Sequence, residues 1–333
     1  MILQGSGQSD VTSIDILNVF NKPVKDWLSN RVKELGYDSK ELLPLIEAAV
    51  EQSKVKVKEE IKERVEREGF TMLEPVILGN IVKEYAYTYI YGALSQTKKF
   101  NSARKRIRSY SSIFLVGAGI SFESGVPLTI LLNDLLRFCS AKDYAELRSN
   151  SQKCKKFKLE FKRVCDTKNP SASHKLIALN FLQHILEIIS LNWDNLIERA
   201  ARELGKEIPK VNEDVEIRPS NTGCLWKFHG DVENIKDDNV KGRGGWVFPD
   251  EDGYVFNNFK EYVKIKGLLE RMFVFVIAGY SEKEENIYNQ IISIFQKDRP
   301  TYRVGLDLKR LREEFYIVGP AEFVLKQILP IQL

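Results

Sequence analysis

The sequence lacks the features that mark a membrane protein, a zinc ribbon or a disulfide-stabilised protein. No apolar run reaches the roughly 18 residues of a membrane-spanning helix, and the polar N-terminus has no signal-peptide pattern. The four cysteines form no CxxC pair, which excludes zinc-ribbon and redox motifs of that spacing. Because 50 basic and 46 acidic residues leave a net charge of only +4, charge alone does not indicate nucleic-acid binding. We expect a cytoplasmic protein with reduced, partly buried thiols and no membrane association.

What remains is the composition of a folded protein of about two domains. The chain has 333 residues, of which 43% are hydrophobic and 29% charged. Residues 1–105 predict an all-helical domain, since apolar residues recur at helical spacing over 11–35, 38–68 and 74–96. Pro23 is expected to interrupt the first of these helices.

A basic segment, Lys98–Arg108, follows the predicted helices, and we place the domain boundary there, so that the second domain spans 106–333. A solvated run is favoured over a nucleic-acid contact at this segment. The third helix carries Tyr85, Tyr89 and Tyr91. Its aromatic side is expected to form an ordinary helical core, while a surface for a homo-oligomer or a protein partner is the less favoured alternative.

From residue 111 onward, short apolar blocks alternate with helical stretches. Blocks of this length separated by helices predict buried parallel strands with crossover helices, and so an α/β, Rossmann-like, doubly wound parallel sheet. In such sheets the ligands lie beyond the carboxyl ends of the strands. The predicted strands are 112–116, 185–190, 224–228, 272–278, 301–306 and 315–318.

The first predicted strand ends in two glycines one residue apart, Gly117 and Gly119. Glycines let the backbone turn sharply and approach a pyrophosphate, although tight turns also use glycine for steric reasons alone. Phe122 stands where the usual dinucleotide fingerprint has its third glycine. The glycine pair by itself is therefore weak evidence for a nucleotide.

Polar or small residues follow three other predicted strands. Asn192 and Asp194 follow the second strand, where either could instead cap the next helix. His229 follows the third strand directly, a position that suits a general base, whereas His174 and His184 lie within helical patterns. Gly279 and Ser281 follow the fourth strand and could contact a ribose or phosphate.

The order of these motifs resembles the sirtuin superfamily, meaning the sirtuins and their prokaryotic sirtuin-like relatives. GAGIS with SGVP is followed by NPSASHKLIAL, LNWDNLIERA, FHGD and IAGYS, so the resemblance covers about residues 110–333. It implies a domain that binds NAD and cleaves the nicotinamide–ribose bond. By this resemblance Asn192 and His229 are the catalytic residues, and the NAD-binding residues are Gly117, Ala118, Gly119, Ser121, Asn192, Asp194, Gly279, Ser281 and Asp307.

The sequence departs from protein-deacylating sirtuins in three ways. Pro127 is followed by Leu-Thr-Ile rather than Asp-Phe-Arg. The two CxxC pairs of the zinc module are missing, so no zinc is expected. In the region that forms part of the acyl-peptide groove of those sirtuins, a hairpin is predicted around 249–253. The motifs SLNWDNLIE and AGYS are closer to those of prokaryotic sirtuin-like proteins, many of which hydrolyse NAD in antiphage defence. Hydrolysis of NAD to nicotinamide and ADP-ribose is favoured, NAD-dependent lysine deacylation is second, and a non-catalytic NAD or ADP-ribose sensor is third.

Overall fold

The chain divides into two compact units. The computed structural model describes residues 2–4, 17–68, 70–72, 75–122, 124, 126, 129–213, 223–234, 245–252, 255–280, 285–295 and 299–333. The first unit comprises residues 1–97 and 306–323, and the second comprises 98–305 and 324–333. The domain limit between residues 105 and 106 stays a prediction. Within the described ranges, no helix is both long and apolar enough to cross a membrane.

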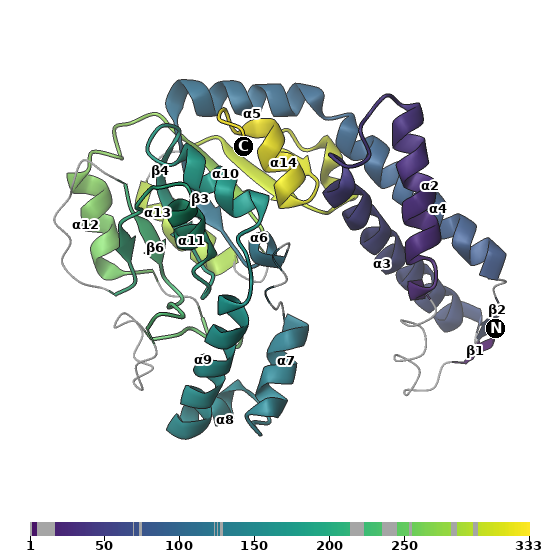
Figure 1. Cartoon of the computed structure of the whole chain (residues 1–333), viewed down its shortest axis with the longest axis horizontal. Helices are drawn as coiled ribbons and strands as arrows, with labels where there is room; N and C mark the ends of the chain where they lie inside the picture. Colours follow the sequence, from purple (N-terminus) through teal and green to yellow (C-terminus); the bar gives the residue numbers. More distant parts are fainter. Residues whose placement is uncertain are drawn as a thin grey trace. The chain divides into compact units, whose positions relative to one another are not determined.

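Three helices dominate the first unit (Figure 1). They are α2 (Asn21–Glu34), α3 (Leu43–Glu68) and α4 (Pro75–Leu94), accompanied by the antiparallel strands β1 (Ile2–Gln4) and β2 (Phe70–Met72). The unit also includes the 3-10 helix η2 (Leu308–Arg312) and strand β9 (Tyr316–Val318). The predicted interruption beside Pro23 is confirmed, because residues 17–18 are helical, 19–20 form a turn, and α2 begins only at residue 21. Pro23 is the third residue of α2, where a proline needs no intrahelical amide bond.

The aromatic side of α4 is partly core and partly surface. Tyr89 is only 1% exposed, as an ordinary helical core predicts, whereas Tyr91 is 62% exposed. Just after α4, the Gln96 amide pairs with both backbone groups of Val318. Its Nε2 donates to the carbonyl at 2.8 Å, and its Oε1 accepts from the amide at 2.9 Å. This contact satisfies backbone groups of β9 that a further strand would otherwise have to satisfy.

The sheet has seven strands in the order β5-β6-β4-β3-β7-β8-β9, and the pairings from β5 to β8 are parallel. The six predicted strands are all present, and the short β5 was missed. The strands not yet placed are β3 (Ser112–Val116), β4 (Ile185–Ser190), β5 (Lys210–Val211), β6 (Leu225–Lys227), β7 (Val274–Ala278) and β8 (Thr301–Gly305).

Helices lie on both faces of this sheet, as a doubly wound fold requires (Figure 1). On one face the strand residues Ile113, Trp226 and Phe275 join a buried cluster with α12 (Asn257–Ile265) and α13 (Glu285–Phe295). Alternate strand residues point the other way. The helices of this unit also include α5 (Thr97–Tyr110), α6 (Gly119–Phe122), α10 (Ala172–Asn180), α11 (Leu196–Glu203) and α14 (Ala321–Ile328).

Between β3 and β4 the chain forms a helical lobe made of α7 (Thr129–Phe138), α8 (Tyr144–Ser149) and α9 (Ser151–Asp166). Its buried cluster includes Trp193, Trp246 and Phe248. The two tryptophan rings lie with their centroids 4.7 Å apart. The hairpin predicted around 249–253 is wrong for the described residues, because 245–248 form no strand. Their aromatic side chains are buried in the lobe instead.

Candidate functional site

The loop after β3 packs directly against the end of β7. A Cβ on Gly117 would lie 2.5 Å from the Gly279 carbonyl oxygen, and one on Gly119 would lie 2.7 Å from the Gly279 Cα. The amide of Gly117 donates to Ala278 at 3.0 Å, and that of Gly119 donates to Gly279 at 2.8 Å. The glycines therefore permit a close backbone approach, and these two amides are already used within the protein.

Ser121, one turn further along, is the centre of a buried hydrogen-bond network. Its hydroxyl donates to Asp194 Oδ2 at 2.8 Å and accepts from Asn192 Nδ2 at 2.9 Å. Its Oγ also lies 3.2 Å from His174 Nε2. Four residues from three separate segments, the β3 loop, α10 and the β4 loop, thus meet at one oxygen atom. Three of these, Ser121, Asn192 and Asp194, were predicted site residues.

His174 takes part in this network as a neutral ring. Its Nδ1 accepts from the Ser171 amide at 3.2 Å, which leaves the proton on Nε2 to donate to Ser121. Complete burial lowers the pKa of His174 to about 4, against the opposing effect of Asp194. We infer that His174 holds Ser121 in place and carries no charge near neutral pH.

Asn192 is 7% exposed, and only one end of its side-chain amide is bonded within the protein. Nδ2 donates to Ser121, whereas Oδ1 is buried and has no hydrogen-bond partner among the described residues. A buried acceptor without a partner costs free energy, on the order of 1–3 kcal/mol. Such an atom is a candidate contact for a ligand hydroxyl or a water.

Asp194 has both a capping and a site contact. Its Oδ1 accepts from the Leu196 amide at 3.1 Å, the helix-capping role that the sequence left open, while Oδ2 accepts from Ser121. Both functions follow from one carboxylate with two oxygens. Asp194 therefore connects the start of α11 to the network around Ser121.

His229 lies at the end of β6, the neighbour of β4. Ser190 pairs with Lys227 in the parallel register, so Asn192 and His229 each follow their paired residue by two positions at the same sheet edge. His229 is 8% exposed, and its carbonyl accepts from the Val247 amide at 3.0 Å. Gly230 next to it has φ +97°, a conformation that favours glycine.

A network of buried charges lies beneath these two loops. Lys227 Nζ donates to the Asp194 carbonyl and lies 4.0 Å from Glu198 Oε1. Lys210 Nζ lies 2.6 Å from Asp231 Oδ2 and 3.8 Å from Glu198 Oε1. Burial opposes the charge of Lys227, but the three carboxylates around it, Glu198 first, outweigh that effect and raise its pKa. These ion pairs and hydrogen bonds connect the loop that carries Asp194 to the loop that follows His229.

The remaining predicted residues lie apart from this network or outside the described ranges. Ala118 is exposed in the β3 loop. Ser281 lies outside the described residues. Asp307 belongs to the first unit, where its Oδ1 caps η2 by accepting from the Lys309 amide at 2.9 Å. The contribution of Asp307 to a nucleotide site stays a prediction.

Sequence reasoning missed His174, Lys227 and Glu198. His174 stands in the motif NPSASHKLIAL and looked structural because it lies in a helical pattern. Lys227 interrupts an otherwise apolar strand, Leu225–Lys227, and a lysine between two buried aromatic residues is a signal that could have been used. Within the described ranges, no group of three or more His, Cys, Asp or Glu side chains could hold a metal ion.

The comparisons with known proteins agree with the motifs. Residues 186–307 match the family model described as SIR2-like domain. No curated protein matches the sequence significantly. Among solved structures, a Sir2 homologue in complex with NAD is 17% identical over 69% of this chain and 92% of its own, with a TM-score of 0.46. A mutant Sir2 homologue with ADP-ribose is 16% identical over 69% and 94%, with a TM-score of 0.47.

The family match covers β4 through β8 and includes Asn192, Asp194, His229 and Gly279. Sequence identity to the solved structures is low, so the family match and the order of the motifs carry the assignment. The resemblance to sirtuins is confirmed for this part of the chain, which therefore contains a sirtuin-like domain.

Proposed function

We propose that the sirtuin-like domain hydrolyses NAD, with Asn192 and His229 as its catalytic residues. The reaction breaks the bond between the nicotinamide nitrogen and ribose C1′. Water supplies the oxygen that forms the new C–O bond, and the products are nicotinamide, ADP-ribose and one proton. NAD is here a substrate, which the residues at the carboxyl ends of β3, β4, β6 and β7 would bind.

The buried Oδ1 atom of Asn192 is the observation that carries this proposal. Because Nδ2 is held by Ser121, the side chain is fixed with its acceptor end available to a ribose hydroxyl or an attacking water. A preorganised polar group of this kind can change the rate by about 100- to 1000-fold. A residue needed only for packing would gain nothing from an unpaired acceptor.

His229 is proposed as the base that accepts the proton. It follows β6 at the sheet edge that also carries Asn192, and the neighbouring Gly230 allows the Trp246 segment to pack directly against this loop. A Cβ at Gly230 would lie 2.8 Å from the Trp246 ring. General base catalysis by a positioned imidazole contributes on the order of 100- to 10,000-fold.

The segment after FHGD supports hydrolysis over deacylation. In protein-deacylating sirtuins this region forms part of the acyl-peptide groove. Here Trp246 is 1% exposed, and its Nε1 donates to the Asp231 carbonyl at 3.0 Å. Its ring packs on Trp193, the residue between Asn192 and Asp194. Side chains that would border a peptide groove are therefore part of a core beside the site.

The experiment is to incubate the purified full chain with NAD, with and without an acetyl-lysine peptide, and to measure nicotinamide and ADP-ribose. Equal release without peptide is the expected result. Release that requires the peptide would favour deacylation, and NAD binding without products would favour a sensor; either outcome would overturn the proposal. Loss of cellular NAD on expression, absent from the Asn192→Ala variant, would support a role as a defence effector.

A further inference from the structure

We propose that a cavity beside α11 binds a small phosphorylated ligand that also carries a hydroxyl group. The cavity has a volume of about 520 Å³, and its lining includes Asn195, Arg199 and Arg202. This volume lies within the range of about 300–1,000 Å³ that small-molecule sites occupy. It is lined by none of the residues that we assign to the NAD site.

Each of the three carboxylates of the cavity lies within ion-pair distance of a lysine side chain, and Glu233 shares its lysine, Lys210, with Asp231 and Glu198. The pairs are Asp166 with Lys162 at 3.4 Å, Glu203 with Lys175 at 2.9 Å, and Glu233 with Lys210 at 2.5 Å. The cations of the lining that have no carboxylate partner are therefore the groups to which an anion could bind.

Those cations are Arg199 and Arg202, which lie three positions apart on α11 and so share one helix face. Arg199 Nη1 donates to the Cys165 carbonyl at 3.0 Å. Arg202 is exposed and adds, after Lys210, to the lowering of the Glu233 pKa. Neither guanidinium has a carboxylate within ion-pair distance among the described residues. Paired guanidinium groups fit the oxygens of a phosphate well.

Asn195 points to the second part of the ligand. The residue is 4% exposed, and its Nδ2 donates to Glu233 Oε1 at 3.2 Å. Its Oδ1 is buried and has no hydrogen-bond partner in the part of the chain that the structure describes. An amide oxygen accepts only, so the fully ionised phosphate group of a phosphate monoester cannot satisfy it, whereas a hydroxyl on the same ligand can.

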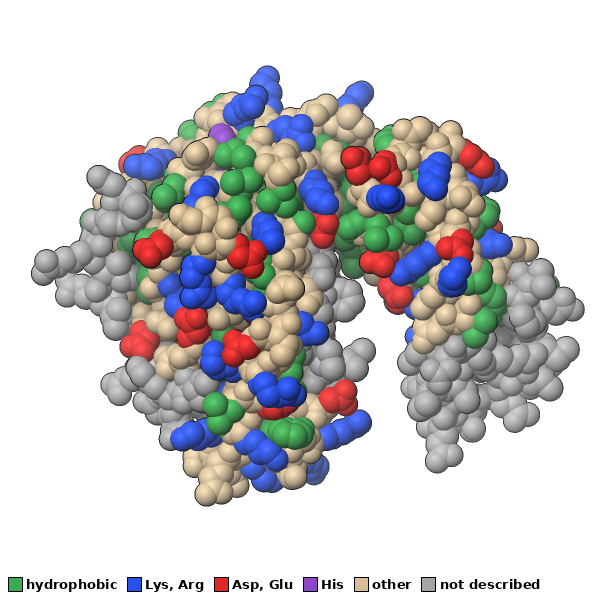
Figure 2. Space-filling model, viewed as in Figure 1, with side chains coloured by type: hydrophobic (Ala, Val, Ile, Leu, Met, Phe, Trp, Pro, Cys, Tyr) green, Lys and Arg blue, Asp and Glu red, His purple; other side chains and the backbone are tan. Residues whose placement is uncertain are grey.

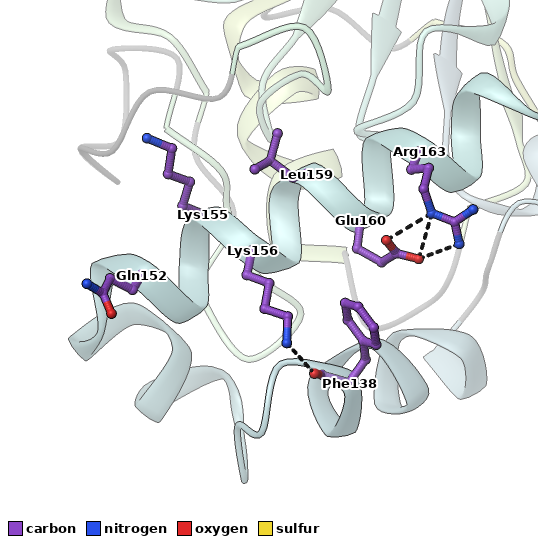
Figure 3. A pocket seen from close by; sticks show the side chains of 7 residues that line it. All are labelled: Phe138, Gln152, Lys155, Lys156, Leu159, Glu160 and Arg163. Carbon is purple, nitrogen blue, oxygen red and sulfur yellow. Dashed lines mark hydrogen bonds and ion pairs between the residues drawn. The ribbon is translucent and has the colours of Figure 1, made fainter.

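A second hollow, on the lobe formed by α7–α9, differs from this cavity in how its cations are paired (Figure 3). It has a volume of about 480 Å³ and is also basic, in keeping with the lysine and arginine side chains that Figure 2 shows over α7–α9. However, Arg163 forms a double hydrogen bond with Glu160, so the guanidinium in this lining is already paired with a carboxylate, unlike those of Arg199 and Arg202. We therefore use this hollow as a control.

The test measures the binding of ribose 5-phosphate to the full chain by calorimetry. We expect Arg202→Gln, an exposed substitution, to raise the dissociation constant by about 10- to 100-fold, the loss typical of a charged hydrogen bond. Arg199→Gln should do the same. Asn195→Ala should reduce the affinity to that of inorganic phosphate, because only the hydroxyl contact is lost. The double variant Lys155→Gln/Lys156→Gln should bind as the wild type does.

Asn192→Ala serves to separate this cavity from the NAD site, and it should leave ribose 5-phosphate binding unchanged. The proposal is overturned if the wild type does not bind, if Arg202→Gln binds equally well, or if the control variants lose as much affinity. Inorganic phosphate binding as tightly as the sugar phosphate would overturn the ligand class. None of these outcomes depends on whether the chain hydrolyses NAD.

Discussion

The Nδ2 atom of Asn192 lies 2.9 Å from the Oγ atom of Ser121 and donates a hydrogen bond to it. Ser121 in turn donates to Asp194, so the orientation of its hydroxyl is set by an acceptor on the same loop as Asn192. The amide of Asn192 is thereby held from one end only. The orientation of the proposed catalytic oxygen depends on a serine 71 residues earlier in the chain.

Asn192→Ala should lower nicotinamide release by about 100- to 1000-fold, because it removes the oriented polar group. The fold should persist, since no apolar packing is lost. Initial rates and near-ultraviolet circular dichroism of both proteins would be compared. A folded variant with activity within a few-fold of the wild type would show that Asn192 is not catalytic.

His229→Ala should slow turnover by about 100- to 10,000-fold, the usual contribution of a general base. Added imidazole should restore part of the rate, because a small base could enter the space left by the side chain. His184→Ala is the matched control and should retain full activity, since His184 lies before β4 at the opposite end of that strand. Unchanged kinetics in His229→Ala would assign the base to another group.

Gly279→Ala tests the close approach of β7 to the first loop. Gly279 has φ +67°, and a Cβ there would lie 2.4 Å from the Ile120 nitrogen. Gly205 has nearly the same dihedral, φ +66°, but nothing lies within 4 Å of its position. Gly205→Ala should cost about 1–2 kcal/mol for the left-handed backbone alone. Gly279→Ala should cost a further 1–3 kcal/mol from overpacking.

Urea unfolding of both alanine variants gives this difference directly. Equal losses of stability would mean that the first loop can move away from Gly279 without cost. Because the loop carries Ser121, we also expect Gly279→Ala to lower nicotinamide release, while Gly205→Ala leaves it unchanged.

Most of the strands were predictable because they are short blocks of largely apolar residues buried on both faces, a pattern that the sequence displays locally. Ser112–Val116 and Val274–Ala278 are examples. The helix α9 was missed although Cys154, Phe157 and Phe161 recur at helical spacing. The many lysines between them concealed an amphipathic pattern.

The network could not be predicted because its parts are distant in sequence. His174 is a helical residue by any local criterion, and its role depends on Ser121, 53 residues away. Lys227 is tolerated in a buried strand only because Glu198 and the Asp194 carbonyl come from another element. Burial of a charge requires partners that only the tertiary fold supplies.

Lys227→Met should destabilise the fold by about 3–5 kcal/mol, because it leaves Glu198 and the Asp194 carbonyl without their buried partner. The double variant Lys227→Met/Glu198→Gln should lose less than the sum of the single losses, since the charge on Glu198 is removed as well. Urea unfolding of the four proteins gives the coupling free energy. Strictly additive losses would show that the two side chains are not coupled.

The pH dependence of stability should report on His174. Its pKa falls from the ordinary 6.5 to about 4 in the folded chain, mainly through burial. Between these values the unfolded chain binds a proton that the folded chain does not, so stability decreases as the pH falls from about 6.5 to about 4. At about 1.4 kcal/mol per pKa unit, the full loss is about 3–4 kcal/mol. Glu198 has the opposite effect, because burial raises its pKa to about 7.

A comparison with His174→Gln separates these two effects, since the variant keeps Glu198 but has no titrating ring at position 174. Glutamine can still donate a hydrogen bond to Ser121. The free energy of unfolding of the wild type minus that of the variant should therefore decrease as the pH is lowered from about 6.5 to about 4. A difference that does not change with pH would mean that the ring is protonated equally in both states, and that it is not buried as a neutral donor beside Ser121.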